Sequence, residues 1–248
     1  MIKALALIFV ILFASCSSDA PKGKTEAESL YREAEELMEA ERYILATEKL
    51  NAIKTQHPYS FYATPAELLQ ADVLFKQDNF VEAAAAYLLF RDFHPKHEKI
   101  PYVVFKIAES YYKQIPDTID RDLEPAIESI KFYDEVLQKY GDSSYSKDAH
   151  TRIEKAQKML RQKDQYIADF YFRTKEWSAA RYWYLDMIER YQDHPTLKHH
   201  AMVKTVESTR MLKEWDACKE YSEKFLQEVD KEDKKAIKLA LDNCDKKI

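Results

Sequence analysis

The fold is decided by a pattern that reads Tyr43-Ile-Leu-Ala-Thr-Glu-Lys-Leu-Asn-Ala-Ile-Lys-Thr-Gln-His-Pro58 and returns as Phe80-Val-Glu-Ala-Ala-Ala-Ala-Tyr-Leu-Leu-Phe-Arg-Asp-Phe-His-Pro95. In each copy an aromatic residue stands three positions before a small residue, and a His-Pro pair ends the segment. The two copies are 37 residues apart. Apolar residues at helical spacing, ended by proline, indicate a helix, and a period of this length is typical of stacked helical hairpins.

The same frame returns further along the chain. It is found at Trp177-Ser-Ala-Ala180 and at Trp215-Asp-Ala-Cys218, and a more degenerate copy runs from Ala126 to Gly141. A small residue nine positions before the aromatic marks a partner helix that can approach closely. Such residues are Ala34, Ala71 and Ala168. The pattern resembles the tetratricopeptide repeat, a helical hairpin of about 34 residues.

These repeats predict an all-α fold, a right-handed solenoid of about five tetratricopeptide hairpins. We expect the units near 26–58, 63–95, 100–141, 162–192 and 197–229. An insertion at 115–125 interrupts unit three, and extra helix at 143–161 runs into unit four. An apolar stripe after unit five predicts a C-terminal capping helix. It consists of Ile237, Leu241, Cys244 and Ile248.

Residues 1–15 are expected to form a lipoprotein signal peptide. Lys3 precedes an apolar run, Ala4 to Ala14, that is shorter than the roughly 20 residues needed to span a bilayer. The next residues, Ser15 and Cys16, complete a segment that resembles a bacterial lipobox. Cys16 is therefore the predicted lipidation site, 16–25 a lipidated linker, and the covalent lipid (palmitate among its acyl chains) the only cofactor expected. An ordinary signal peptide is the alternative.

Composition excludes several classes of function. The chain has 38 basic and 43 acidic residues, a net charge of −5, which argues against wrapping nucleic acid. Only two glycines occur in 248 residues, Gly23 and Gly141, so neither a P-loop, nor a dinucleotide fingerprint, nor a nucleophile elbow can be written. No nucleophile stands beside a base, and we expect no catalytic residue: the protein is predicted not to be an enzyme.

Two histidine pairs and two cysteines are the remaining candidates for a metal site or a disulfide. The pairs His94/His97 and His199/His200 lack Cys or carboxylate at ligand spacing, so no metal site is expected. Cys218 takes a repeat position that requires a small residue, which favours a buried thiol. The alternative is a disulfide with Cys244, because the two lie on opposite sides of a predicted helix reversal near Asp230 and the export compartment is oxidising.

The chain as a whole resembles the BamD family of outer-membrane lipoproteins from the β-barrel assembly machinery. The segments that carry the resemblance are His57-Pro-Tyr-Ser-Phe-Tyr-Ala63, Phe93-His-Pro95, Asp120-Arg-Asp122, Lys139-Tyr-Gly-Asp-Ser-Ser-Tyr145 and Asp169-Phe-Tyr-Phe-Arg-Thr-Lys-Glu-Trp-Ser-Ala-Ala180. The resemblance implies a lipid-anchored protein on the periplasmic face of a Gram-negative outer membrane. Its implied partners are a BamA-type barrel subunit, docked through POTRA domains, other assembly-machinery lipoproteins, and unfolded outer-membrane proteins as clients.

The repeat resemblance also implies which residues form a groove. The frame places the client groove in repeats 1–3 (26–141), and the family resemblance makes 142–248 the docking module, with the extra helix, repeats 4–5 and the cap. The groove candidates from the frame are Tyr31, Met38, Leu68, Phe75, Lys76, Tyr102, Phe105, Tyr112 and Lys113, and the loop after repeat one adds Tyr59, Phe61 and Tyr62 at the rim. The docking candidates are Arg181, Trp183 and Tyr184. Unit four is expected to be more polar, with Gln162, Gln165, Asp169, Phe172 and Arg173.

A client's C-terminal strand is expected to place its terminal ring among Tyr31, Phe75 and Tyr112, with Lys76 or Lys113 near its carboxylate. The alternative is that these side chains pack against the 115–125 insertion or a neighbouring unit. Another periplasmic tetratricopeptide lipoprotein, acting in division, polysaccharide export or a peptidoglycan-linked process, is the competing function. A peptidoglycan-acting enzyme is disfavoured because the repeats use up the chain.

Overall fold

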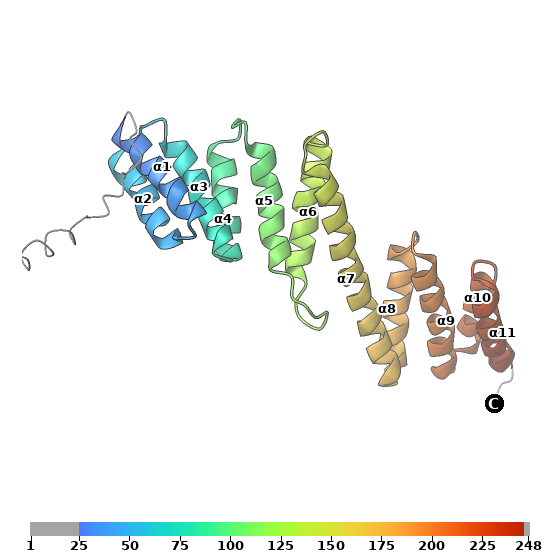
Figure 1. Cartoon of the computed structure of the whole chain (residues 1–248). Helices are drawn as coiled ribbons and strands as arrows, with labels where there is room; N and C mark the ends of the chain where they lie inside the picture. Colours follow the sequence, from blue (N-terminus) through green and yellow to red (C-terminus); the bar gives the residue numbers. More distant parts are fainter. Residues whose placement is uncertain (1–24, 246–248) are drawn as a thin grey trace, which may run out of the picture. The chain divides into compact units, whose positions relative to one another are not determined.

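A computed structural model describes residues 25–245, and its elements are drawn in Figure 1. Within this range every regular element is an α-helix, as predicted. The helices are α1 (Glu26–Glu39), α2 (Tyr43–Gln56), α3 (Ala63–Lys76), α4 (Phe80–Phe93), α5 (Ile100–Lys113), α6 (Glu124–Lys139), α7 (Ser146–Arg173), α8 (Trp177–Arg190), α9 (Pro195–Met211), α10 (Trp215–Phe225) and α11 (Lys231–Asp245). The predicted all-α tetratricopeptide fold is confirmed. No helix among these residues is long and apolar enough to cross a membrane.

The helices form two compact bodies, called unit 1 and unit 2 from here on, and these are not the repeats numbered in the sequence. Unit 1 runs to Gln114 and includes Glu135–Ser146, and unit 2 comprises Ile115–Asp134 and the chain from Lys147 onward. The division passes through α6, whose two ends belong to different units. The assignment of 26–141 to clients and 142–248 to docking stays a prediction.

Four of the hairpin turns use the same backbone conformation. Glu41, Asp78, Lys175 and Lys213 have φ values of 58°, 58°, 67° and 62°. Each stands two residues after a helix end, in the left-handed region that usually takes glycine because a Cβ is strained there. The chain therefore makes its repeat turns with polar residues, which explains how a protein with two glycines closes so many hairpins.

Unit 1 is held together by small residues where helices meet and large ones between them. Ala34 and Ala46 are fully buried at the α1–α2 contact, and Leu50, Ile53 and Val73 fill the space toward α3. Burying each aliphatic side chain contributes about 1.5–3 kcal/mol. The alanines identified from the repeat pattern are thus the points of closest helix approach.

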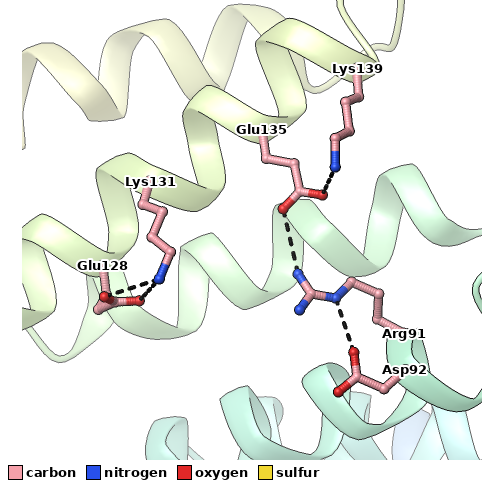
Figure 2. A network of polar contacts seen from close by, with 6 residues as sticks. All are labelled: Arg91, Asp92, Glu128, Lys131, Glu135 and Lys139. Atoms are coloured by element: carbon pink, nitrogen blue, oxygen red, sulfur yellow. Dashed lines mark hydrogen bonds and ion pairs between the residues drawn. The ribbon is translucent and has the colours of Figure 1, made fainter.

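A polar network joins the end of α4 to α6 within unit 1 (Figure 2). Nη1 of Arg91 donates to Oε2 of Glu135 at 3.4 Å, and Nζ of Lys139 donates to the other oxygen at 2.9 Å. Nε of Arg91 also lies 3.5 Å from the carboxylate of Asp92. The Arg91–Glu135 pair is partly exposed, and pairs of this kind near the surface contribute at most about 1 kcal/mol each.

Unit 2 is built on the long helix α7. It spans 28 residues, so the extra helix and the first helix of unit four are one continuous element, as expected. The predicted insertion precedes it: Leu123 is buried, and Nζ of Lys163 on α7 donates to the carbonyl of Arg121. Pro125 lies inside the first turn of α6 rather than in the insertion, because proline has no N–H to lose there.

Helix α11 closes unit 2. Ile237 and Cys244 are buried against Met202, Val206 and Phe225, which supports the predicted cap; Ile248 lies outside the described residues. The structure joins Cys218 to Cys244 in a disulfide, with their Cα atoms 6.2 Å apart, inside the usual range.

Candidate functional site

An aromatic hollow of about 390 Å³ opens in unit 1 between α1, α3 and the segment before α5. Four of the predicted groove residues line it: Tyr31, Phe61, Tyr62 and Leu68. The rings of Tyr31 and Tyr62 lie 5.4 Å apart, and Phe61 meets Tyr62 edge-on at 5.5 Å. Leu68 is only 4% exposed and forms the floor. The hollow can therefore receive an aromatic or aliphatic side chain.

The walls of the hollow are acidic. Glu35, Asp72 and Glu98 line it together with Lys99. Burial and the neighbouring Glu35 carboxylate, to which its hydroxyl is hydrogen-bonded, raise the pKa of Tyr31, so its phenol stays protonated. The hollow combines an apolar interior with polar groups at its edge, which is the usual make-up of a peptide-side-chain pocket.

Asp72 connects this hollow to a second cluster on α4 and α5. Its Oδ1 accepts hydrogen bonds from the hydroxyl of Tyr87 at 2.5 Å and from that of Tyr102 at 2.6 Å. Burial raises the pKa of both tyrosines, and the Asp72 charge raises each further. Both phenols therefore remain donors, and the carboxylate charge is compensated inside the fold.

Lys106 completes this cluster and was not predicted. Its Nζ lies 3.0 Å from the centroid of the Phe75 ring, a cation–π contact, and burial lowers the pKa of Lys106 to about 8. Lys76 and Lys113 add to this lowering, while Asp72 opposes it. Lys106 stands one turn after Tyr102, so a helical-face comparison with that predicted residue would have identified it.

The remaining groove candidates are dispersed. Phe75 packs on Phe80 at 5.3 Å and on Lys106, so it does not share the Tyr31 hollow. Phe105 stacks on Tyr145 at 4.9 Å, which fits the alternative that some of these rings pack on a neighbouring segment. Met38 lines a different hollow with Glu36 and Glu39, Tyr59 is fully exposed, Tyr112 is half-buried, and Lys76 and Lys113 are exposed.

The docking candidates on α8 have different environments. Tyr184 is fully buried and its hydroxyl donates to Asp169 at 2.6 Å, so it belongs to the core of unit 2 and cannot contact a partner directly. Arg181 pairs with Glu214, the N-cap residue of α10, and Trp183 is half-buried. The neighbouring Tyr182, which the repeat frame did not select, is 69% exposed.

In the folded chain His199 lies near two carboxylates that are about thirty residues away in the sequence. Its Nδ1 lies 3.8 Å from carboxylate oxygens of both Asp230 and Asp233, because α9 packs against α11. Oδ1 of Asp230 accepts the backbone N–H groups of Glu232 and Asp233 at 3.0 Å, and these bonds lower its pKa. The cluster is thus the N-cap of α11.

Comparison with known proteins gives the chain its family. The model of the YfiO family, described as "Outer membrane lipoprotein", matches residues 23–225. "Outer membrane protein assembly factor BamD" of Rickettsia prowazekii is 30% identical over 226 residues, covering 90% of this chain and 88% of that protein. The protein of the same name from Vibrio cholerae is 28% identical over 183 residues, covering 70% and 76%.

Among solved structures, the TPR2AB-domain:pHSP90 complex of yeast Sti1 is 13% identical, with 90% of this chain and 100% of that chain covered and a TM-score of 0.43. The family match spans α1 to α10 and the relatives cover most of both chains. The chain therefore belongs to the YfiO/BamD family of outer membrane lipoproteins.

Proposed function

We propose that this protein is an assembly factor for outer-membrane proteins and acts by binding, without catalysis. The observation that carries the proposal is the family match over residues 23–225. It is supported by relatives named as assembly factors, of which the Rickettsia prowazekii protein is covered over 88% of its length. The repeat fold supports it, because stacked helical hairpins present extended surfaces to other proteins.

The anchor is the part of the proposal outside the described residues. Cys16 would carry the lipid and hold the protein on the periplasmic face of the outer membrane. From Cys16 to Glu26 the chain has ten residues, a reach of roughly 35 Å when extended. Unit 1 would therefore work close to the membrane surface, where its clients insert.

The client site is the aromatic hollow of unit 1. A client strand with an aromatic end would place that ring between Tyr31, Phe61 and Tyr62, over the Leu68 floor. Lys106 replaces Lys76 and Lys113 as the preferred cation for the client's carboxylate, because it is half-buried beside Phe75 and Asp72. A partly desolvated ammonium gains more from a carboxylate than an exposed one does.

The docking surface lies in unit 2. A BamA-type barrel subunit would contact α8 through its POTRA domains, at Arg181, Trp183 and the exposed Tyr182 rather than the buried Tyr184. Arg181 already bridges to Glu214, so this surface is held in a fixed geometry before a partner arrives. Other assembly-machinery lipoproteins are expected in the same complex.

Fluorescence anisotropy with a labelled outer-membrane-protein peptide ending in Phe tests the client site. The double variant Tyr31→Ala/Phe61→Ala should weaken binding roughly tenfold or more, since two aromatic contacts are lost. Phe170→Ala on α7, an exposed ring outside the hollow, is the matched control and should leave the affinity unchanged. Equal affinities for the double variant and the wild type would refute the assignment.

Pull-down from detergent-solubilised outer membranes tests the docking. The wild-type protein should retain the barrel subunit, and Tyr182→Ala/Trp183→Ala should lose it while still binding the client peptide. Recovery of division or peptidoglycan factors in place of a barrel subunit would refute the assembly role.

A further inference from the structure

The cluster around Asp72 in unit 1 occurs a second time, in unit 2. The segment Ala71-Asp72-x-x-Phe75-Lys76 returns 97 residues later as Ala168-Asp169-x-x-Phe172-Arg173, and Phe80 and Tyr87 return as Trp177 and Tyr184. The third helix repeats it as well: Tyr102-x-x-x-Lys106-x-x-Glu109 corresponds to His200-x-x-x-Lys204-x-x-Glu207.

The polar contacts of the two clusters match. Oδ1 of Asp169 accepts from the Tyr184 hydroxyl at 2.6 Å and lies 3.0 Å from Nε2 of His200. In unit 1 the same atom of Asp72 takes two tyrosine hydroxyls at 2.5 and 2.6 Å. His200 thus replaces Tyr102 as the second partner, and each aspartate is held by one side chain from each of two following helices.

The cation and its ring match too. Nζ of Lys204 lies 4.2 Å from the centroid of Phe172, and Phe172 meets Trp177 edge-on at 5.1 Å. The corresponding ring pair in unit 1, Phe75 with Phe80, is also edge-on, at 5.3 Å. Phe172 is the aromatic member of the more polar set expected in repeat four, and α9 brings Lys204 over its ring.

The fold alone does not require these residues. At the same repeat positions the α1–α2 hairpin has Met38 for the ring and Leu50 for the tyrosine, and the α9–α10 hairpin has Arg210 and Ser222. These hairpins form without an aspartate, tyrosine, ring and lysine in one place. The α5–α6 hairpin has Glu109, Tyr112 and Tyr133 at the positions of the aspartate, the ring and the tyrosine, so these three can belong to the packing of a repeat. What the α3–α4 and α7–α8 hairpins share beyond it is a lysine from the following helix over the ring, and this cation–π pair is the feature that indicates a shared binding role.

The hollows beside the two clusters also correspond, but their linings differ. In unit 2 a hollow of about 280 Å³ lies between α7 and the start of α9, with Gln162 and Gln165 at the positions of Pro65 and Leu68. Lys158, Arg161 and His194 line it as well, and no acidic side chain does. The unit 1 hollow is aromatic and acidic, whereas this hollow is basic.

We propose that unit 2 carries a second peptide-binding site, formed by α7, α8 and α9, that takes an extended polypeptide segment with acidic side chains. Lys204, whose Nζ also donates to Glu207 at 2.7 Å, would hold the peptide beside Phe172, as Lys106 is proposed to do beside Phe75 in unit 1. Lys158 and Arg161 would pair with the carboxylates of the peptide. This inference rests on the proposed client site for the role of the shared cluster. Its ligand differs in charge from the aromatic-ended peptide of unit 1.

Two labelled peptides distinguish the sites: the Phe-ended client peptide, and a short acidic peptide of alternating Glu and Val with an amidated C-terminus. Lys158→Glu/Arg161→Glu should weaken the acidic peptide roughly tenfold or more and leave the client peptide within about twofold. Tyr31→Ala/Phe61→Ala should do the reverse. Lys155→Glu, a charge reversal on an exposed residue of α7 outside the hollow, is the matched control and should weaken neither.

Lys204→Met keeps the apolar stem over Phe172 and removes the charge. It therefore tests the contact of the Lys204 ammonium with the peptide without opening the core. It should also weaken the acidic peptide alone. The inference is overturned if wild-type protein does not bind the acidic peptide, if the charge reversal leaves its affinity unchanged, or if the two peptides displace each other fully. An unchanged client-peptide affinity in Tyr31→Ala/Phe61→Ala, with the acidic site intact, would instead count against the proposed client site.

Discussion

The bridge between Cys218 and Cys244 allows a stability prediction whose size follows from the fold. The two cysteines are 26 residues apart and tie α10 to the closing helix α11. Closing a loop of that length removes chain entropy worth about 3.5 kcal/mol from the unfolded ensemble. Both sulfurs lie in the core of unit 2, Cys218 at 0% and Cys244 at 3% exposure, so reduction changes the tether more than the packing.

Hydrogen exchange of the α11 amides measures this directly, because α11 is the terminal element and opens first. Reduction should speed exchange of amides around Ile237 and Ala240 by up to roughly 300-fold, the rate equivalent of the lost free energy. The amides of α2 in unit 1 serve as an internal reference and should not change. Cys244→Ala should exchange fast with or without reductant.

The result that would refute this reasoning is an oxidised protein whose α11 amides exchange as fast as those of the reduced protein. That outcome would mean that the thiols stay free, or that apolar burial alone fixes α11.

Three further predictions concern single residues. Tyr87→Phe removes one of two donors to Asp72 and should lower the free energy of unfolding by about 1–2 kcal/mol in a urea titration; no change would mean that the bond contributes nothing. Burial by itself raises the pKa of Asp169, but hydrogen bonds led by that from His200 outweigh it and lower the pKa. The Asp169 carboxylate therefore stabilises the fold above the unfolded pKa of about 3.9, and this stabilisation is lost as pH falls through the lowered folded-state pKa. Asp169→Asn should therefore show a smaller drop in melting temperature between neutral and acidic pH than the wild type. Lys175→Gly, at a φ of 67°, should raise the melting temperature by relieving about 1 kcal/mol of left-handed strain; a lower melting temperature would contradict this.

The repeat frame and the approximate bounds of the repeats could be read from the sequence. Their signals are local: a small residue, an aromatic three or nine positions away, and a proline after the helix all act within one hairpin. The capping helix and the continuous α7 follow from the same kind of signal. The repeat frame also selected Tyr31 and Leu68, because it states which helical face is turned toward the groove. Phe61 and Tyr62 were selected from the loop after repeat one, as part of the segment that carries the family resemblance.

What only the tertiary structure decided is which side chains from different helices meet. Lys106 reaches Phe75 from the next hairpin, and Lys204 reaches Phe172 in the same way, so neither pair shows in the spacing of one helix. The same reason explains the errors: Tyr184 was predicted at a surface but donates to Asp169 inside the core. Helical periodicity tells which face of a helix a residue occupies, but the packing of helices tens of residues apart determines whether that face is core, cap or binding site.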